Sequence, residues 1–235
     1  LIVLGNAIRD DAKETFKYFA DQGVEIKVIS GDNPITVSSV AKDAGIAGAE
    51  NCVDASSLDT DEKLAEAAVK YTVFGRVQPD QKRRIVQALK ASGKVVAMTG
   101  DGVNDVLALK SADCSVAFRS GSDAACNAAQ IVLLESNFSC MPSVVLEGRR
   151  VVNNIQRTAA LFLVKNIFSM LLAVFTLIAG HRYPLYPTQL SLLGAFTIGA
   201  PGFLLALQPN KNIISGNFLV NVTIKALPAA LTDFL

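Results

Sequence analysis

The chain has 235 residues, of which 51% are hydrophobic and 18% are charged, and its formal net charge is +1. This balance, without a basic cluster, argues against nucleic acid as a partner. The four cysteines match no paired metal-binding spacing, so we interpret them as reduced structural thiols. The average conceals two unlike parts, because residues 1–157 carry nearly all of the charges and residues 158–235 contain long apolar runs.

Apolar stretches that suit strands alternate with helical patterns through residues 1–157. The expected strands are residues 1–4, 24–30, 72–77, 94–98, 114–118 and 131–134. The expected helices are residues 10–21, 34–43, 80–91 and 104–111. Such alternation predicts a doubly wound α/β fold, with a parallel sheet covered by helices on both faces. Ligands of such folds bind beyond the carboxyl ends of the strands.

The stretch Ser30-Gly31-Asp32 follows one of the expected strands. Ser30 offers a hydroxyl, and Gly31 a backbone N–H, to the oxygens of a phosphate group. Asp32 has a second interpretation, because its side chain would cap the helix that starts near Pro34. From these residues alone, both interpretations stay open.

Lys82 lies near the start of another expected helix, in the stretch GRVQPDQKRR. Pro79 suits the first turn of that helix. The basic residues Lys82, Arg83 and Arg84 suit a solvated helix face, and taken alone this is the favoured interpretation.

The strand expected at residues 94–98 delivers a glycine-flanked carboxylate into a tight loop, TGDGVND. Gly100 and Gly102 lack side chains, so the backbone can turn sharply and approach a ligand. Asp101 and Asp105 supply hard oxygen ligands or negative charge beside it. This layout predicts a site for Mg²⁺ and a phosphoryl group. The alternative is ordinary turn chemistry between a strand and a helix.

The second part of the chain predicts transmembrane helices. Residues 158–180 and 188–207 form two apolar runs, the first with one charge and the second with none, and both are long enough to span a bilayer. We interpret residues 213–235 as the start of a further span. Residues 142–153 precede the first span without a helix breaker, which predicts one long helix that continues into it.

Two features of these spans point to an ion path. Lys165 and Asn166 lie near the middle of the first span, where an ionisable residue is costly and faces a partner, water or an ion. Pro201, with Gly199 and Gly202, predicts a local break in the second span that frees carbonyl groups for an ion. A structural kink without ion contact is the alternative.

Several of these stretches together resemble the P-type ATPases, ion pumps that carry a phosphoaspartate in a haloacid-dehalogenase-like domain. The resemblance is carried, in the family's order and over essentially the whole chain, by SGDNP, FGRVQPDQK, TGDGVND, the span containing LVKN and the run TIGAPGFLLALQPN. It implies that residues 1–157 are the C-terminal part of a cytosolic phosphorylation domain, including a stalk helix.

The resemblance also implies roles for individual residues. The catalytic residues would be Lys82, Asp101 and Asp105. Asp101 would bind Mg²⁺, with Asp105 as a second candidate ligand. The phosphoryl oxygens would be held by Ser30, Gly31, Asp32, Lys82 and Asn104, with the Lys82 ammonium offsetting charge on the transferring group. The ion path would contain Lys165, Asn166, Thr197, Gly199 and Pro201.

The chain also departs from the family pattern. The family's nucleophile is the Asp of a DKTG motif, and neither this motif nor the nucleotide-binding domain occurs in the 235 residues. We therefore expect these residues to be inactive by themselves. Ser169 and Ile198 stand where calcium and sodium-potassium pumps carry acidic residues, which argues against a multi-carboxylate calcium site. Lys165 suggests an internal counter-cation.

The sequence thus predicts a fragment of an ATP-driven cation pump, with calcium as the first candidate ion, in a multi-pass protein of the cell membrane. ATP would be its substrate and Mg²⁺ its cofactor. Its partners would be the lipid bilayer, the transported inorganic cation and the rest of the same pump chain. The alternatives are a membrane-tethered phosphatase of the same superfamily and a non-catalytic membrane module.

Overall fold

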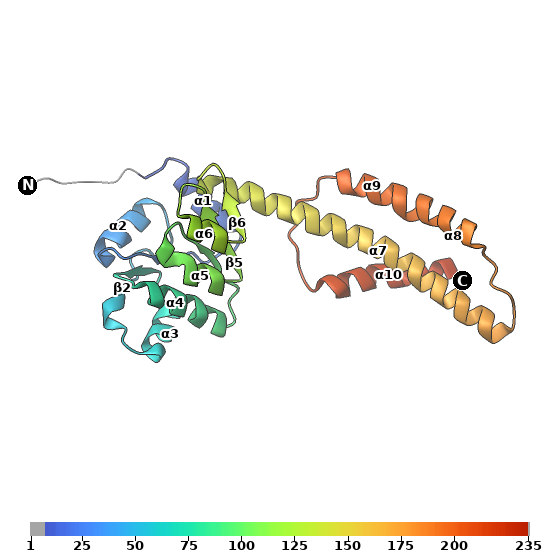
Figure 1. The fold of residues 1–235 in the computed structure, drawn as a ribbon, viewed down its shortest axis with the longest axis horizontal. Helices are drawn as coiled ribbons and strands as arrows, with labels where there is room; N and C mark the ends of the chain where they lie inside the picture. The colour runs from blue at the N-terminus through green and yellow to red at the C-terminus, as the bar shows by residue number, and fades with distance from the viewer. Residues whose placement is uncertain (1–7, 235) are drawn as a thin grey trace, which may run out of the picture. The chain divides into compact units, whose positions relative to one another are not determined.

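The computed structural model of the protein describes residues 8–234 and divides into two compact units, one up to Pro142 and one from Ser143 (Figure 1). The first unit combines helices with parallel strands, and the second is helical. The strand expected at residues 1–4 lies outside the described residues. The two units therefore differ in architecture as well as in composition.

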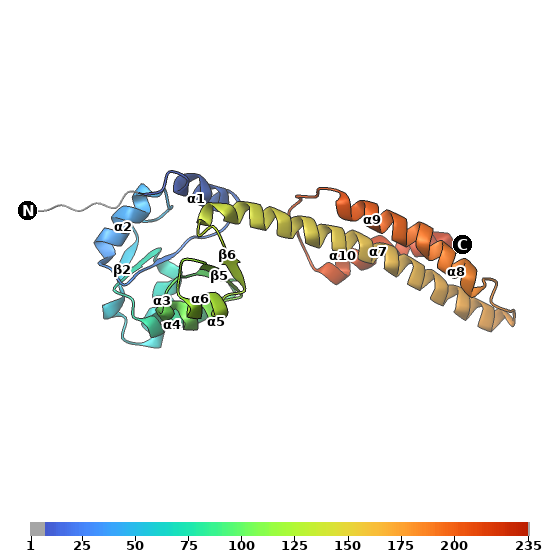
Figure 2. The ribbon, with the colours of Figure 1, turned by 45° about the horizontal axis from the view of Figure 1, so that its top comes forward.

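Helices and short strands alternate through the first unit (Figures 1 and 2). Its helices are α1 (Ala12–Asp21), α2 (Pro34–Asp43), α3 (Asp61–Lys70), α4 (Pro79–Ala91), α5 (Val106–Ser111) and α6 (Asp123–Ala128), with short 3₁₀ helices η1 (Ala55–Ser57), η2 (Val103–Asp105) and η3 (Phe138–Cys140). Its strands are β1 (Val28–Ile29), β2 (Cys52–Asp54), β3 (Val73–Gly75), β4 (Ala97–Thr99), β5 (Cys114–Phe118) and β6 (Ile131–Leu133). Most strands are shorter than expected, and β2, α3 and α6 are not among the elements predicted from the sequence.

The strands form two three-stranded parallel sheets, with the orders β1-β3-β2 and β4-β5-β6. Val73 of β3 pairs with Val28 of β1, and Val116 of β5 pairs with Thr99 of β4. The parallel arrangement confirms the prediction, whereas the single sheet that we expected is wrong for the described residues. The reason is that β1 and β4 are each an edge strand and are not hydrogen-bonded to one another.

Helices cover both faces of the first sheet. Val73 belongs to a buried cluster with Val37 of α2, whereas Phe74 belongs to a cluster with Leu64 of α3 and Ile85 of α4. Successive residues of a strand point to opposite faces, so α2 lies on one face and α3 with α4 on the other. Burial of each large apolar side chain stabilises the unit by about 1.5–3 kcal/mol. The doubly wound α/β class is therefore confirmed.

A separate core holds α4 against the second sheet. Val86 of α4 is buried with Met98 of β4, Leu109 of α5 and Ala117 of β5. Because α4 contributes to this cluster and also to the core of the first sheet, it connects the two. The loop after β4 is thereby placed beside the first turns of α4.

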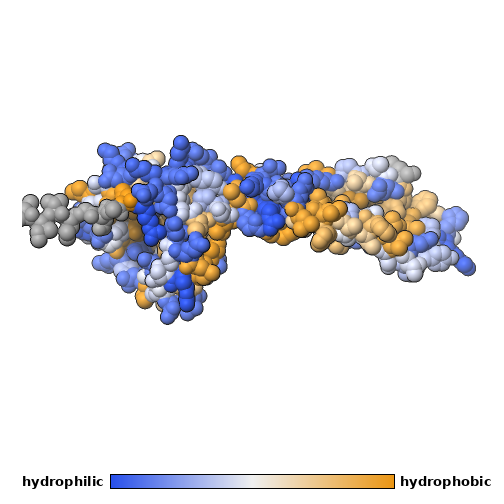
Figure 3. All heavy atoms as spheres, turned by 90° about the horizontal axis from the view of Figure 1, so that it is seen from above, coloured by the Kyte–Doolittle hydropathy of each residue, from blue (hydrophilic) through white to orange (hydrophobic). Residues whose placement is uncertain are grey.

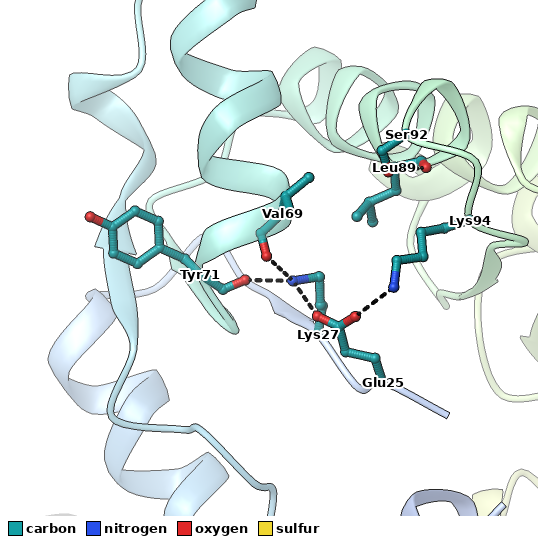
Figure 4. A network of polar contacts seen from close by, with 7 residues as sticks. All are labelled: Glu25, Lys27, Val69, Tyr71, Leu89, Ser92 and Lys94. Carbon is teal, nitrogen blue, oxygen red and sulfur yellow. Dashed lines mark hydrogen bonds and ion pairs between the residues drawn. The ribbon is translucent and has the colours of Figure 1, made fainter. Parts of the chain in front are cut away.

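A polar network joins segments that precede β1 and β4 (Figure 4). The Lys27 side chain is 9% exposed, and its Nζ donates a hydrogen bond to the Tyr71 carbonyl at 2.8 Å and to the Val69 carbonyl at 3.4 Å. The same Nζ lies 2.9 Å from a carboxylate oxygen of Glu25. The other Glu25 oxygen lies 3.5 Å from Lys94 Nζ. The network thus links the end of α3 with both segments.

The second unit consists of helices. They are α7 (Met141–Ala179), α8 (Pro187–Gly194), the π-helix η4 (Ala195–Gly199), α9 (Ala200–Leu207) and α10 (Phe218–Phe234). α7 runs unbroken through the region of residues 142–158, which confirms the long helix expected there.

Two helical stretches, Phe138–Ala179 and Pro187–Leu207, are long and apolar enough to cross a membrane. Hydrophobic side chains lie along the visible face of this part of the molecule (Figure 3). Leu177 and Ile178 of α7 are each more than four-fifths exposed. Such exposure of large apolar residues suits a surface in contact with lipid.

Before Pro201, the helical stretch Pro187–Leu207 contains a wider, π-helical turn but no break. The backbone of Ala195–Gly199 forms a π-helix, and α9 continues through Pro201. Proline lacks an N–H group, and its ring clashes with the carbonyl four residues earlier, so a wider turn relieves the conflict. The break expected around Gly199 and Gly202 is therefore corrected to a π-helical turn.

Candidate functional site

The loop after β4 folds tightly because Gly100 has no side chain. Gly100 N donates to the Val116 carbonyl at 3.1 Å, which keeps the loop aligned with β5. A Cβ atom on Gly100 would lie 2.6 Å from Asp105 Cβ and 2.8 Å from its Cγ. Only glycine permits this approach, because real Cβ contacts are not that short. Asp105 is therefore held directly over the start of its own loop.

Asp105 forms an ion pair with Lys82. Lys82 Nζ lies 2.7 Å from Asp105 Oδ1, and the two side chains are 16% and 9% exposed. The second carboxylate oxygen, Oδ2, accepts a hydrogen bond from Gly102 N at 3.2 Å. Both oxygens of this nearly buried carboxylate thus have a donor, as a buried charge requires.

Lys82 reaches this position from the first turn of α4. Pro79 occupies the first position of the helix, and Gln81 Oε1 accepts from Gln78 N at 3.0 Å. A proline and a capping hydrogen bond at this end fix where the helix begins. The solvated helix face considered for Lys82 is wrong, because its ammonium group points inward to Asp105.

Asp101 lies on the surface, and its main-chain carbonyl is held by the segment that precedes α6. Ser122 N donates to the Asp101 carbonyl at 2.7 Å, and a Cβ atom on Gly121 would lie 2.6 Å from that oxygen. Gly121 and Ser122 are not among the site residues predicted from the sequence. A signal was available, since the turn-forming stretch RSGSD directly follows the apolar stretch CSVAF.

The side chains of Asp101 and Asn104 are free to bind a ligand. Both residues are exposed, and the described part of the chain gives neither side chain a hydrogen-bond partner. Asp105 differs, because its two oxygens are already engaged. Among the described residues there is also no group of three or more His, Cys, Asp or Glu side chains arranged to hold a metal.

Mg²⁺ fits this arrangement as an ion held by one carboxylate. Mg²⁺ usually keeps several waters and binds proteins through one or two carboxylates together with substrate phosphates. Asp101 provides such a carboxylate. The main chain there is held by the hydrogen bonds of Gly100 to β5 and of Ser122 to the Asp101 carbonyl. Asp105 supports the loop and holds Lys82, so the geometry favours Asp101 over Asp105 as the ligand.

The Ser30–Asp32 turn is organised by its own hydrogen bonds. Asp32 N donates to Ser30 Oγ at 3.2 Å, and Ser30 Oγ lies 3.3 Å from Asp32 Oδ2. The cap of α2 is Asn33, whose Oδ1 accepts from Ile35 N at 2.9 Å. The capping role considered for Asp32 is therefore wrong, because the residue directly before the first helical position supplies the cap.

Space is left open at Gly31. A Cβ atom there would have the Val77 carbonyl, 4.0 Å away, as its nearest neighbour. Val77 N also donates to the Ser30 carbonyl at 3.0 Å, so this turn is tied to the segment that leads into α4. Across residues 8–234, the structure shows no hydrogen bond or ion pair between the Ser30–Asp32 turn and Lys82, Asp101 or Asp105. Their convergence on one phosphate stays a prediction.

In the helical unit, Lys165 lies against the turn that precedes the π-helix. A Cβ atom on Gly194 would lie 3.0 Å from Lys165 Nζ, so the ammonium group occupies the space that this glycine leaves. Within the π-helix, Thr197 Oγ1 donates to the Leu193 carbonyl at 2.6 Å. Asn166 is exposed, and its side chain has no hydrogen bond in the described structure. The structure therefore places Lys165, but not Asn166, beside the π-helix.

The doubly wound unit, with its carboxylate loop and Lys82, first indicates the class of protein. A protein-family model described as "haloacid dehalogenase-like hydrolase" matches residues 1–113. The chain is 48% identical to the calcium-transporting ATPase CtpE of Mycolicibacterium smegmatis, over 98% of this chain and 30% of that protein. It is 44% identical to the "Probable cation-transporting ATPase exp7" of Streptococcus pneumoniae, over 98% of this chain and 31% of that protein.

A solved structure agrees on the fold. The crystal structure of a zinc-transporting PIB-type ATPase aligns with a TM-score of 0.60 and 20% sequence identity, covering 94% of this chain and 28% of that one. Over nearly its whole length the chain is thus related to P-type cation-transporting ATPases. It spans about a third of the length of the curated relatives that it matches.

Proposed function

We propose that the chain is part of an ATP-driven pump that forms a phosphoaspartate intermediate and moves a cation across the cell membrane. One observation carries the proposal: the largely buried Lys82–Asp105 ion pair lies against a glycine loop that presents Asp101 to solvent. The same chain continues into helices that are long and apolar enough to span a bilayer. A soluble hydrolase would need the loop but not these helices.

Each residue of the proposed site has a distinct task. The Lys82 ammonium offsets negative charge on the transferring phosphoryl group, and Asp105 holds that ammonium in place. Gly31 N and the Asn104 side chain donate to phosphoryl oxygens. Ser30 Oγ does so when its proton turns away from Asp32 Oδ2, while Asp32 N continues to donate to Ser30 Oγ.

Asp101 would hold Mg²⁺, which, when bound, neutralises charge on the phosphate oxygens. The phosphorylated Asp and the ATP-binding residues would belong to the rest of the same polypeptide, because no DKTG motif occurs here.

The helical unit would form the membrane part of the pump. We assign residues 1–157 to the cytosolic side, residues 158–180 and 188–207 to two spans of a multi-pass protein, and residues 213–235 to the start of another. The ion path would include Lys165, Asn166, Thr197, Gly199 and Pro201. The π-helix supports this assignment, because wider turns free backbone carbonyls that can coordinate an ion.

Calcium is the first candidate cargo, because the relative at 48% identity is named a calcium-transporting ATPase. The Lys165 ammonium would act as an internal cation beside the path, limiting the charge that the path accepts. This role also fits Ser169 and Ile198, which bring no carboxylate to the positions where the resemblance to calcium pumps would place one.

The test is the ATPase activity of the complete polypeptide in lipid vesicles, with Ca²⁺, Mn²⁺, K⁺ and Na⁺ titrated separately at fixed Mg²⁺. We expect stimulation by one ion, and we expect Asp101→Asn to abolish both the stimulated turnover and the acid-stable phosphorylation by ATP. Asp80→Asn makes the same chemical change at an exposed carboxylate of α4 and should leave turnover unchanged. Turnover of a folded sample that no ion stimulates would overturn the pump and favour a phosphatase.

A further inference from the structure

The end of α9 is held by a side chain from α7. Asn154 Nδ2 donates to the carbonyls of Ala206 and Gln208, each at 3.2 Å. α9 ends at Leu207, so these are among the carbonyls that no residue within the helix can satisfy. Asn154 is 7% exposed, and its two hydrogen bonds are therefore made out of contact with solvent.

Two neighbours of Asn154 bind the segment that follows α9. Asn153 Nδ2 donates to the Asn212 carbonyl at 2.9 Å, and Arg157 Nη1 donates to Gln208 Oε1 at 2.8 Å. All three donors lie on one turn of α7. Their shared target is the end of α9 and the first residues after it, so this turn of α7 acts as a clamp.

The contact between α7 and the α8–α9 stretch continues beyond the clamp. Figures 1 and 2 both show this stretch lying along α7. A Cβ atom on Gly202 would lie 3.4 Å from Thr158 Cγ2, and one on Gly194 would lie 3.0 Å from Lys165 Nζ. Gly194, Gly202 and Ala206 are spaced by multiples of four, which places small residues on one helix face. Small residues allow close helix packing in lipid, where apolar burial gives no driving force.

The chemistry of the clamp requires an N–H donor at residue 154. Both partners are carbonyl oxygens, so the side chain must present N–H groups to them. Within the described residues Asn154 Oδ1 has no donor, which means that the amide orientation is set by Ala206 and Gln208 alone. A residue without N–H groups would leave these carbonyls unpaired in a water-poor site, which is costly.

We propose that Asn154 is a positioning residue that locks the end of α9 to α7, so that these helices move as one body during transport. This inference rests on the proposed pump function. It places the transport movement between this helix pair and other parts of the polypeptide, with no sliding of α9 along α7. The π-helix and Lys165 would then keep their mutual position through the cycle.

The first test joins the two helices covalently in the complete polypeptide, in a cysteine-free background in lipid vesicles. The pair Thr158→Cys and Gly202→Cys replaces two residues that approach each other across the helix pair, and each single variant serves as a control. We expect the oxidised pair to keep at least half of the ion-stimulated ATPase of the reduced pair. A loss greater than tenfold on oxidation, reversed by a reductant, would overturn the inference. Absence of ion-stimulated turnover in the unmodified polypeptide would overturn the pump itself.

The second test compares Asn154→Leu with Gln156→Leu. Gln156 is also a buried amide on α7, and the described structure shows no hydrogen bond from it to α9 or the following loop. We expect Asn154→Leu to lower the ion-stimulated turnover at least tenfold while phosphorylation by ATP persists, and Gln156→Leu to lower it less than threefold. Equal losses in the two folded variants would overturn the positioning role, because a general packing defect would then explain both.

Discussion

Lys82 and Asp105 show how much of the site depends on one pair of charges. The two side chains are largely buried and come from α4 and the loop after β4, 23 residues apart. Each charge is compensated mainly by the other, so removing one leaves the other buried without a partner. The pair therefore both stabilises the fold and sets the position of the ammonium group.

We predict that Lys82→Met lowers the free energy of opening of β4 and α5 by about 3 kcal/mol, since it leaves the Asp105 carboxylate uncompensated. Hydrogen exchange of peptides from residues 97–111, in the complete polypeptide, measures this energy. The control is Arg83→Met, whose ion pair with Asp80 is exposed, so a change below about 1 kcal/mol is expected. Similar losses of opening free energy in the two variants would show that the buried ion pair stabilises the fold no more than the exposed one.

At the same scale, a few residues of the site could be predicted from the sequence and others could not. Gly100, Asp101 and Asp105 stand out because a glycine-flanked carboxylate after a strand is a local pattern. Gly121 does not stand out, because the atom that leaves no space for a side chain there is the carbonyl oxygen of Asp101, 20 positions earlier. A contact between distant residues leaves no local signal.

Among the elements, the segments before β1 and β4 are joined by charge as well as by packing. Hydrogen bonding to the Lys27 ammonium holds the pKa of the Glu25 carboxyl below its usual value, despite the opposing effect of burial. A lowered folded-state pKa means that the ionised carboxylate stabilises the fold above its unfolded pKa of about 4.5. That contribution is lost as the pH falls through the lower, folded-state value.

We predict that Glu25→Gln lowers the melting temperature of the first unit at pH 7, and that the difference from the unmodified protein shrinks as the pH falls below about 4.5. Calorimetry of the complete polypeptide at pH 7 and pH 3.5 measures both. The comparison must be a difference, because hydrogen bonds also lower the pKa values of Asp11, Asp54 and Asp113. A difference that grows at pH 3.5 would contradict the sign of the shift.

The π-helix η4 is the element whose shape depends on a single residue. Pro201 cannot donate to the carbonyl of residue 197, and its ring excludes a regular turn there. We predict that Pro201→Ala lets Ala195–Gly199 adopt an ordinary α-helical turn and raises the ion concentration for half-maximal ATPase stimulation at least fivefold. The measurement is the ion titration of the complete pump, with Pro187→Ala, at the start of α8, as the control. An unchanged midpoint would remove the π-helix from the ion path.

Over the whole molecule, many of the elements and the two kinds of environment follow from local sequence alone. Apolar periodicity and turn residues are local, so α2 and β5 appear with their expected bounds, and charge-poor runs mark the helices that can meet lipid. Three other features depend on the tertiary fold: the strands form two sheets, Lys82 points inward, and Asn154 donates hydrogen bonds to the end of α9. Each of these rests on residues far apart in the chain, such as Asn154 and Ala206 at 52 positions, and only folding brings their atoms within hydrogen-bond distance.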